Sequence, residues 1–286
     1  DQFTGVLGGM IEHFHHRLLG GGPKGLADGY RHGAPWQEEG WFTDLVNREA
    51  VAFVEANQER PFFLSIAHLV PHKPLQAPPA REARFAHIQD PARRTFAAMV
   101  SGLDDGLGEL RTCLDRLGLS DDTIIVFSSD HGWDRRPSVA DGYICPQGGL
   151  RGGKYGLYEG GIRVPLIIHW PGVTRTGSSS EEMLSTMDLF PTLLGAAGLP
   201  LPTGRELDGR DLLAVLAHDA PSPHDELCFY YSDAAIGIPA QAAVRRGPWK
   251  LLRVAEETQL FHLPDDPAET RDRVDDYPGV AAGLFD

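Results

Sequence analysis

The chain has 286 residues and a formal net charge of −14, with 40 acidic against 26 basic residues. This charge argues against nucleic acid and against an anionic membrane as partners, because both favour a basic protein face. A hydrophobic content of 42% fits one large α/β domain, or one medium domain with a smaller partner. No apolar run approaches the roughly 20 residues of a membrane span. The three cysteines are widely separated and show neither a disulfide framework nor zinc spacing, so they leave the compartment open.

Residues 1–40 are rich in glycine and histidine and show no sustained period, which predicts loops with short elements. His13, His15 and His16 lie close together in this stretch. No carboxylate or cysteine has metal-ligand spacing to them, so we interpret the three histidines as part of a surface loop.

The next stretch alternates helical and extended patterns. Apolar residues at helical spacing predict an amphipathic helix over 42–57, with Thr43 as its N-cap. The apolar run 62–67 predicts a buried strand. The charged stretch 81–95 is typical of a surface segment, and a second periodic pattern predicts a helix from Phe96 to about Gly118.

Two histidines follow the predicted strand 62–67. His72 lies between Pro71 and Pro74, and the prolines restrict the backbone so that the imidazole is held in one direction. The residues alone favour an ordinary turn histidine at this position. For His68 they leave open whether it packs in the core or supports a nearby site.

The stretch from Thr123 to Pro165 organises the chain. A β-branched apolar run, 123–129, predicts a strand buried on both faces, and it leads directly into Asp130 and His131. Ligands collect at the carboxyl ends of strands in open α/β sheets, so two possible metal ligands stand where a site is expected. A glycine-dense segment, 149–165, then presents Lys154 as a lone ammonium among residues that allow close backbone approach. Taken one by one, these side chains could also be a turn residue, a solvated loop histidine and a solvated lysine.

The C-terminal third changes character. A strand is predicted over 164–170, and a helix is predicted to start at Asp188 and to end at the stop formed by Gly198 and Pro200. Beyond a linker at 217–223, short β-rich runs predict a small antiparallel sheet with strands at 227–231, 242–245, 249–252 and 259–263. The last residues, 279–286, resemble the beginning of a helix.

Several motifs in this order and spacing resemble the second half of the sulfatase family. No single one of them is specific, but together they cover most of the chain. They are Pro61–Leu64, Pro71–Pro78, Ser128–Gly132, Gly152–Lys154, Glu159–Pro165, Arg246–Leu251 and Leu260–Thr270.

The resemblance implies an α/β fold of the alkaline-phosphatase-like type, with a mostly parallel central sheet flanked by helices and a small C-terminal antiparallel sheet. It divides the chain into a portion of the catalytic α/β domain, 1–217, and a small α+β subdomain, 218–286.

The resemblance also implies a sulfuric ester hydrolase acting on a small-molecule or glycan sulfate ester, either aryl or carbohydrate. Asp130 and His131 would ligate one divalent ion, calcium in this family. Lys154 would bridge the sulfate and the leaving oxygen, and His72 would bind sulfate or protonate the leaving group. Glu159 and Arg163 are expected to pair with each other or with backbone rather than with substrate.

The sequence departs from the family in its nucleophile. Sulfatases form formylglycine from a Cys/Ser-x-Pro-x-Arg motif, and this motif does not occur in the 286 residues; at Cys145 the proline follows the cysteine directly. The paired N-terminal aspartates of the family are missing as well. We therefore expect an N-terminally truncated chain that is inactive by itself, and a periplasmic or secreted location stays open because a signal region is not seen.

Two other functions remain open from the sequence. Related enzymes of the superfamily hydrolyse phosphate or phosphonate esters with similar metal and lysine groups. Alternatively, the same residues could bind a sulfated glycan without catalysis.

Overall fold

The computed structural model describes residues 2–8, 10–18, 26–134 and 147–285, so Cys145 lies outside the described residues. The chain forms two compact units, Asp1–Thr123 and Ile124–Asp286. The predicted boundary between 217 and 218 falls at the end of the helix α6 (Leu213–His218) and stays a prediction.

The first unit combines a small sheet with two long helices. Strands β1 (Thr4–Val6), β2 (Gly29–Arg31) and β3 (Ala34–Pro35) pair antiparallel in that order, which confirms short elements within the first 40 residues. The remaining elements are α1 (Phe42–Asn57), α2 (Pro79–Ala83), α3 (Pro91–Leu117) and the 3₁₀ turn η1 (Ser120–Asp122). None of the described helices combines the length and the apolar character needed to cross a membrane.

The long helices follow the predicted periods, but their starts differ from the prediction. The predicted N-cap Thr43 is wrong, because α1 begins after Trp41 and Thr43 is buried within its first turn. Helix α3 begins five residues before Phe96, since the Asp90 side chain accepts the Arg93 N–H at 2.8 Å and Pro91 opens the helix. It ends at Gly118 in the left-handed conformation, as predicted.

The strand predicted over 62–67 is not formed. The segment is extended and its exposure alternates along the chain, but no described strand pairs with it, and Phe63 is 76% exposed. A strand requires a hydrogen-bonded neighbour, so an apolar alternating run without one remains an extended segment.

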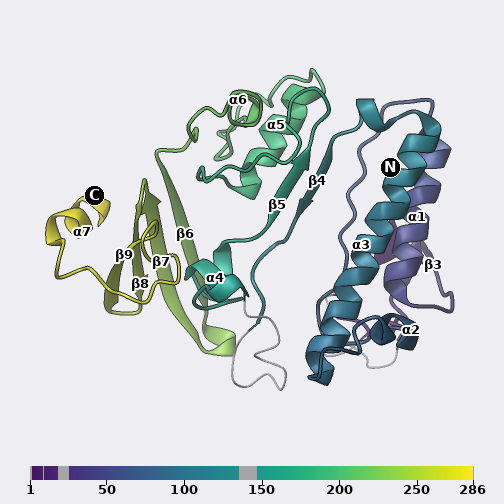
Figure 1. Ribbon diagram of the computed structural model, residues 1–286, viewed down its shortest axis with the longest axis horizontal. Helices are drawn as coiled ribbons and strands as arrows, with labels where there is room; N and C mark the ends of the chain where they lie inside the picture. The colour runs from purple at the N-terminus through teal and green to yellow at the C-terminus, as the bar shows by residue number, and fades with distance from the viewer. Residues whose placement is uncertain (1, 9, 19–25, 135–146, 286) are drawn as a thin grey trace. The chain divides into compact units, whose positions relative to one another are not determined.

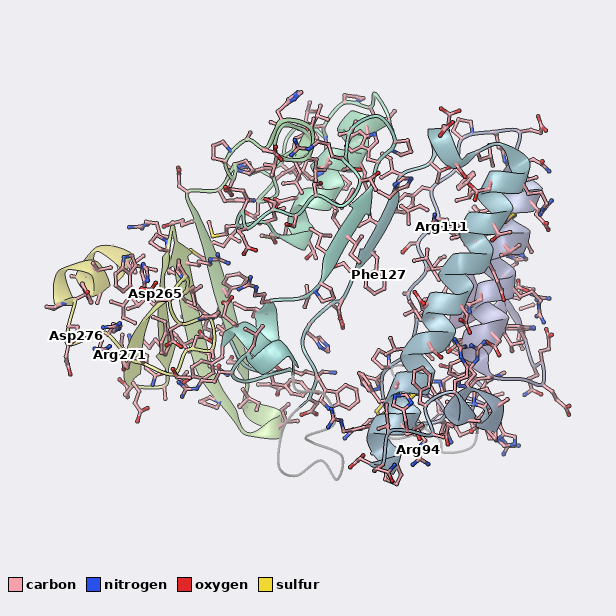
Figure 2. All side chains as sticks on the ribbon, viewed as in Figure 1. Arg94, Arg111, Phe127, Asp265, Arg271 and Asp276 are labelled. Carbon is pink, nitrogen blue, oxygen red and sulfur yellow. The ribbon has the colours of Figure 1, made fainter. Side chains whose placement is uncertain are left out.

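In the second unit, the run after Thr123 forms the predicted strand. Strand β4 (Ile125–Ser128) pairs antiparallel with β5 (Leu166–His169), and Figure 2 shows Phe127 projecting from β4. All strand pairs among the described residues are antiparallel, so the parallel part of the expected central sheet is not found among them. The helices of this unit are α4 (Glu159–Ile162), α5 (Leu189–Ala196), α6 and α7 (Pro278–Phe285), with 3₁₀ turns η2 (Gln147–Gly149), η3 (Thr186–Asp188) and η4 (Ala234–Ile236).

The predicted C-terminal sheet is confirmed. Strands β6 (Glu226–Asp233), β7 (Ile238–Arg246), β8 (Trp249–Val254) and β9 (Glu257–His262) form an antiparallel meander (Figure 1). One face packs Ala243, Leu252 and Phe261 against Leu157, in the segment leading into α4. The other face packs Leu251 and Leu260 against α7. The sheet is therefore covered on both faces.

Helices α1 and α3 approach closely at two glycines of α3. Asn47 of α1 is buried and donates its side-chain N–H to the Gly102 carbonyl at 3.0 Å. A Cβ at Gly106 would lie 2.1 Å from the Asn47 Cγ, whereas a Cβ at Gly108 would meet nothing within 4 Å.

We predict that Gly106→Ala lowers the free energy of unfolding by about 1–3 kcal/mol, because the methyl group displaces the hydrogen-bonded Asn47 side chain. Gly108→Ala, the control on the same helix, should raise it by about 0.5–1 kcal/mol through lower backbone entropy. Urea unfolding of both variants checks this. Equal effects of the two substitutions would contradict the close approach.

Candidate functional site

Asp130 and His131 stand directly after β4, where the sequence places them. The His131 Nε2 lies 2.9 Å from the Asp130 Oδ2, and both side chains are accessible, at 37% and 79% of their surface. The Asp130 Oδ1 accepts the backbone N–H of His131 at 3.0 Å. The two side chains therefore converge on one point in solvent reach.

This pair fits one end of a cation site. The His131 Nδ1 lies 3.0 Å from the Gly132 carbonyl oxygen, which suits a ring that is protonated at Nδ1 and keeps its Nε2 lone pair toward Asp130. Two lone-pair acceptors at 2.9 Å repel each other unless a proton or a cation lies between them. Among the described residues, no group of three or more His, Cys, Asp or Glu side chains could hold a metal, so a complete ligand set is not found around the pair.

The lysine loop, residues 149–162, is tied to this strand end by backbone hydrogen bonds. The Lys154 N–H donates to the Trp133 carbonyl at 3.0 Å, and the Gly132 N–H donates to the Gly161 carbonyl at 3.0 Å. These bonds place the backbone of the lysine loop beside the segment that follows His131.

The Lys154 ammonium is available for an anion. Its Nζ lies 5.1 Å from the centroid of the Tyr155 ring, a cation–π distance. Within the described ranges, no carboxylate lies at ion-pair distance from it, whereas Arg163, Arg175 and Lys250 of the same unit are paired with carboxylates. An ammonium without a carboxylate partner among these residues suits the recognition of a sulfate or phosphate group.

Close packing explains the glycines of this loop. A Cβ at Gly161 would lie 2.1 Å from the Gly156 carbonyl oxygen and 2.5 Å from that of Gly153. Gly152 has a φ of 75°, in the left-handed region, and a Cβ there would lie 2.9 Å from the Tyr158 Cβ. A side chain at either position would push residues 152–158 of the lysine loop away from α4 at its end.

Glu159 and Arg163 interact as predicted, but a stronger partner was missed. The Arg163 N–H donates to the Glu159 carbonyl at 2.7 Å, and the two side chains approach to 3.9 Å. The Glu159 Oε1 instead accepts from the Lys250 Nζ at 2.9 Å, and the same ammonium lies 2.8 Å from the Glu269 Oε1. In the sequence, the lone lysine of an apolar strand is the signal for this buried triad, and it does not identify the two distant carboxylates.

His72 lies in the first unit, whereas the three other predicted residues belong to the second. Its Nδ1 lies 2.8 Å from the Lys73 carbonyl oxygen, and its own N–H donates to the Leu69 carbonyl at 2.8 Å. The imidazole is thereby held by its own turn. Its part in a site with Lys154 stays a prediction.

The surface-loop interpretation of the histidine cluster is wrong for two of its three members. His13 and His16 are only 1% and 3% exposed, while the His15 side chain is exposed and pairs with Glu12. The His13 Nε2 lies 3.4 Å from the His72 carbonyl oxygen, and its backbone N–H donates to the Gln76 side chain at 2.8 Å. His13 therefore supports the His72 turn, a role that needs the folded chain to be seen.

His68 is a half-buried histidine of the same unit. Burial lowers its pKa from the ordinary 6.5 to about 4. Its Nδ1 is buried and has no hydrogen-bond partner among the described residues. The imidazole is thus held neutral, which favours a packing role over a direct role at a site.

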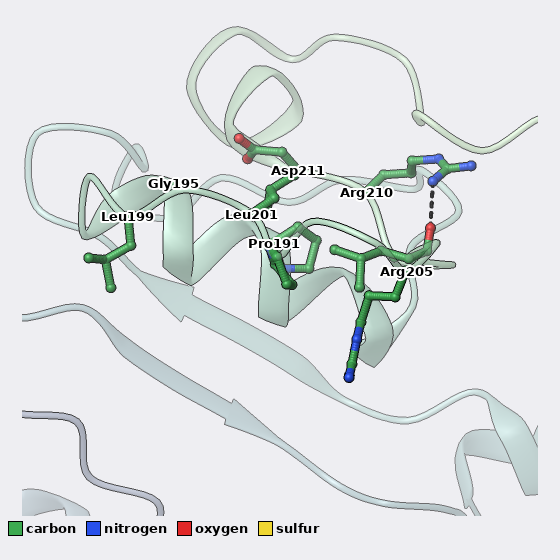
Figure 3. A pocket seen from close by; sticks show the side chains of 10 residues that line it. Pro191, Gly195, Leu199, Leu201, Arg205, Arg210 and Asp211 are labelled. Atoms are coloured by element: carbon green, nitrogen blue, oxygen red, sulfur yellow. Dashed lines mark hydrogen bonds between the residues drawn. The ribbon is translucent and has the colours of Figure 1, made fainter.

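A separate hollow of about 370 Å³ lies at α5 and the loop that follows it (Figure 3). Two of its polar groups are already used, because the Arg210 guanidinium donates to the Leu207 carbonyl and the Asp211 carboxylate accepts the Leu213 N–H. None of the predicted site residues lines it.

Residues 13–199 match the Sulfatase family model, and residues 153–281 match the C-terminal model of N-sulphoglucosamine sulphohydrolase. The chain belongs to the sulfatase family. It is 37% identical to human arylsulfatase A over 213 residues, covering 74% of this chain and 39% of that protein. It is 35% identical to human steryl-sulfatase over 194 residues, covering 67% of this chain and 32% of that protein. This sulfatase-family chain thus spans well under half the length of either relative.

Solved structures agree with this assignment. Ps i-CgsB superposes with a TM-score of 0.81 at 30% identity, over 91% of this chain and 58% of its own. The sulfatase PsFucS1 from Pseudoalteromonas superposes with a TM-score of 0.70 at 22% identity, over 90% of this chain and 55% of its own. The predicted alkaline-phosphatase-like α/β class is confirmed.

The burial of His68 predicts a pH dependence of stability. Its folded pKa is about 4 against 6.5 for the free side chain, so between these values the unfolded chain binds more protons than the folded one. Stability contributed by neutral His68 is complete above pH 6.5 and is lost as the pH falls towards about 4. The full loss is at most about 3 kcal/mol.

We therefore expect His68→Gln to flatten the fall in unfolding free energy between pH 7 and pH 4, measured by urea unfolding. His15→Gln is the control, because its side chain is exposed. A slope that is unchanged in His68→Gln would contradict the buried, neutral imidazole.

Proposed function

We propose that this chain supplies the leaving-group side and part of the metal side of a sulfatase site that acts on a sulfate ester. One observation carries the proposal. Lys154, which has no carboxylate at ion-pair distance among the described residues, stands on a loop whose backbone is hydrogen-bonded to the segment that follows Asp130 and His131. Cleavage of a sulfate ester develops negative charge on the sulfate oxygens and on the leaving oxygen. Cationic groups at these positions lower the energy of that charge.

Each residue has a distinct role in this proposal. Asp130 and His131 would hold one divalent metal, calcium by family resemblance, which would offset charge on the sulfate oxygens when bound. A histidine ligand also suits softer ions than calcium. Lys154 would donate hydrogen bonds to a sulfate oxygen and to the leaving oxygen. His72 would bind sulfate or donate a proton to the leaving oxygen.

The relatives support a substrate that is either an aryl or steryl sulfate or a sulfated carbohydrate. Their names include steryl-sulfatase and arylsulfatase A, and the solved structure of Ps i-CgsB at 30% identity was also determined in complex with k-i-k-neocarrahexaose. The residues of this chain do not decide between these alcohols.

The sequence as given lacks the motif from which sulfatases form the formylglycine nucleophile of the covalent step. No Cys/Ser-x-Pro-x-Arg motif occurs among its 286 residues. Positioning groups without a nucleophile bind the ester but do not form the covalent intermediate. We therefore propose that the chain as given binds sulfate esters and does not hydrolyse them above background.

Lys154→Ala should weaken the binding of 4-nitrophenyl sulfate by about tenfold or more, because a hydrogen bond to a charged group contributes about 1.5–3 kcal/mol. Titration of the 286-residue chain by NMR measures the affinity, and Arg253→Ala, which removes an exposed basic residue, is the control. Equal affinity of the wild type and Lys154→Ala would refute the anion-binding role. Preferential binding of 4-nitrophenyl phosphate would favour the phosphatase alternative.

Calcium binding should be weak, with a dissociation constant of about 1 mM or above, since a hard cation needs about six oxygen ligands and this chain offers a partial set. Asp130→Asn should abolish it, whereas Asp208→Asn, an exposed carboxylate elsewhere in the unit, should not. Calorimetry checks both variants. Tight binding that survives Asp130→Asn would place the cation elsewhere.

A further inference from the structure

The lysine loop is held by polar side chains from three strands of the C-terminal sheet. Gln241 of β7 accepts the Leu157 N–H at 3.2 Å and donates to the Tyr155 carbonyl at 3.0 Å. Gln259 of β9 accepts the Tyr158 hydroxyl at 2.6 Å. Between them, Lys250 of β8 reaches Glu159, the first residue of α4, as described above. Side chains on this face of the sheet thus hold residues 155–159 in one conformation.

Lys250 is the centre of this contact and is unusual in its burial. Its exposure is 0%, and the side chains of Glu159 and Glu269 are 2% and 0% exposed. Glu269 also accepts the Glu159 backbone N–H at 2.6 Å, and burial raises the pKa of Glu269. Three ionisable groups are therefore kept out of water at one point, which costs free energy unless their geometry is well satisfied.

Stability of the sheet does not account for this arrangement. An apolar side chain of similar volume at a buried charged position is often as stabilising as the ion pair, or more so. The opposite face of the same sheet shows that solution, with Leu251 and Leu260 packed on Ala281 and Leu284. Hydrogen-bonded ion pairs fix the direction and the distance between the groups that they join, which apolar contacts do not.

The triad is connected to the predicted site by a short chain of backbone hydrogen bonds. Glu159 is followed by Gly160, whose N–H donates to the Arg151 carbonyl at 2.7 Å. The carbonyl of the next residue, Gly161, accepts the Gly132 N–H. A shift of Glu159 therefore moves both the lysine loop and the segment after His131.

We propose that Lys250, with Glu159 and Glu269, is a positioning residue that fixes the lysine loop and so sets where the Lys154 ammonium lies relative to Asp130 and His131. The proposal deepens the proposed function and rests on it for the meaning of that position. Lys250 itself touches no substrate, because it is buried beneath the loop.

Amide hydrogen exchange of the 286-residue chain tests the proposal. Lys250→Met should raise the exchange rates of the Gly132, Lys154 and Gly160 amides by about tenfold or more, while the β7–β8 ladder amides keep their protection. A triple variant, Lys250→Met with Glu159→Gln and Glu269→Gln, removes all three charges together and should give the same pattern. If Lys250→Met alone does not fold, because it leaves two buried carboxylates without a cation, the exchange rates of the triple variant test the proposal.

A matched control separates positioning from general destabilisation. Leu284→Ala leaves a cavity on the opposite face of the same sheet, and should raise the exchange of ladder and loop amides in parallel. Wild-type protection of the three loop amides in the triple variant would overturn the proposal. So would a parallel loss of loop and ladder protection, or loss of the folded sheet in both Lys250 variants.

These outcomes are independent of the proposed function, because exchange is measured without ligand. A chain that fails to bind 4-nitrophenyl sulfate but shows the selective exchange would refute the sulfatase site and keep the positioning role. A chain that binds the ester normally but shows no selective exchange would keep the proposed sulfatase site and refute the positioning role.

Discussion

A lysine ammonium buried between two carboxylates is the interaction on which the lysine loop of this sulfatase-family chain depends. Lys250 lies in strand β8, which pairs with β7 on one side and β9 on the other. Through Glu159 it reaches the first turn of α4, and from there backbone bonds run to the end of β4. A rigid sheet thereby controls the shape of a glycine-rich segment that has little core of its own.

The sheet holds the backbone of the loop, and the loop carries the charged groups of the predicted site at accessible positions. Asp130 and His131 stand at a strand end, where side chains stay accessible while the backbone is held. Lys154 stands on a loop whose glycines allow close approach to the neighbouring carbonyl groups. The acidic chain as a whole repels an anion, so a local ammonium is needed to attract one, together with the cation that Asp130 and His131 are proposed to hold.

The sequence predicted the parts that follow from local pattern. Helices α1 and α3 and the C-terminal strands obey their hydrophobic periods, and Asp130, His131 and Lys154 occur in short motifs. The extended segment 62–67 could not be decided locally, because strand formation depends on a partner elsewhere. The triad joins residues 91 and 110 positions apart, so no window of sequence contains it. A lone lysine in an apolar strand was the one available signal, and Glu159 was expected to pair with Arg163 or with backbone.

If the sheet acts on the anion site through Lys154, a double-mutant cycle of these residues will show coupling between them. The affinity for 4-nitrophenyl sulfate would be measured in the wild type, Lys154→Ala, the triple variant of Lys250, Glu159 and Glu269, and the combination of both. We expect the triple variant to weaken binding about tenfold in the wild-type background and to have no further effect once Lys154 is removed. Equal losses in both backgrounds would contradict it, because the triad would then act on binding by a route that does not pass through Lys154.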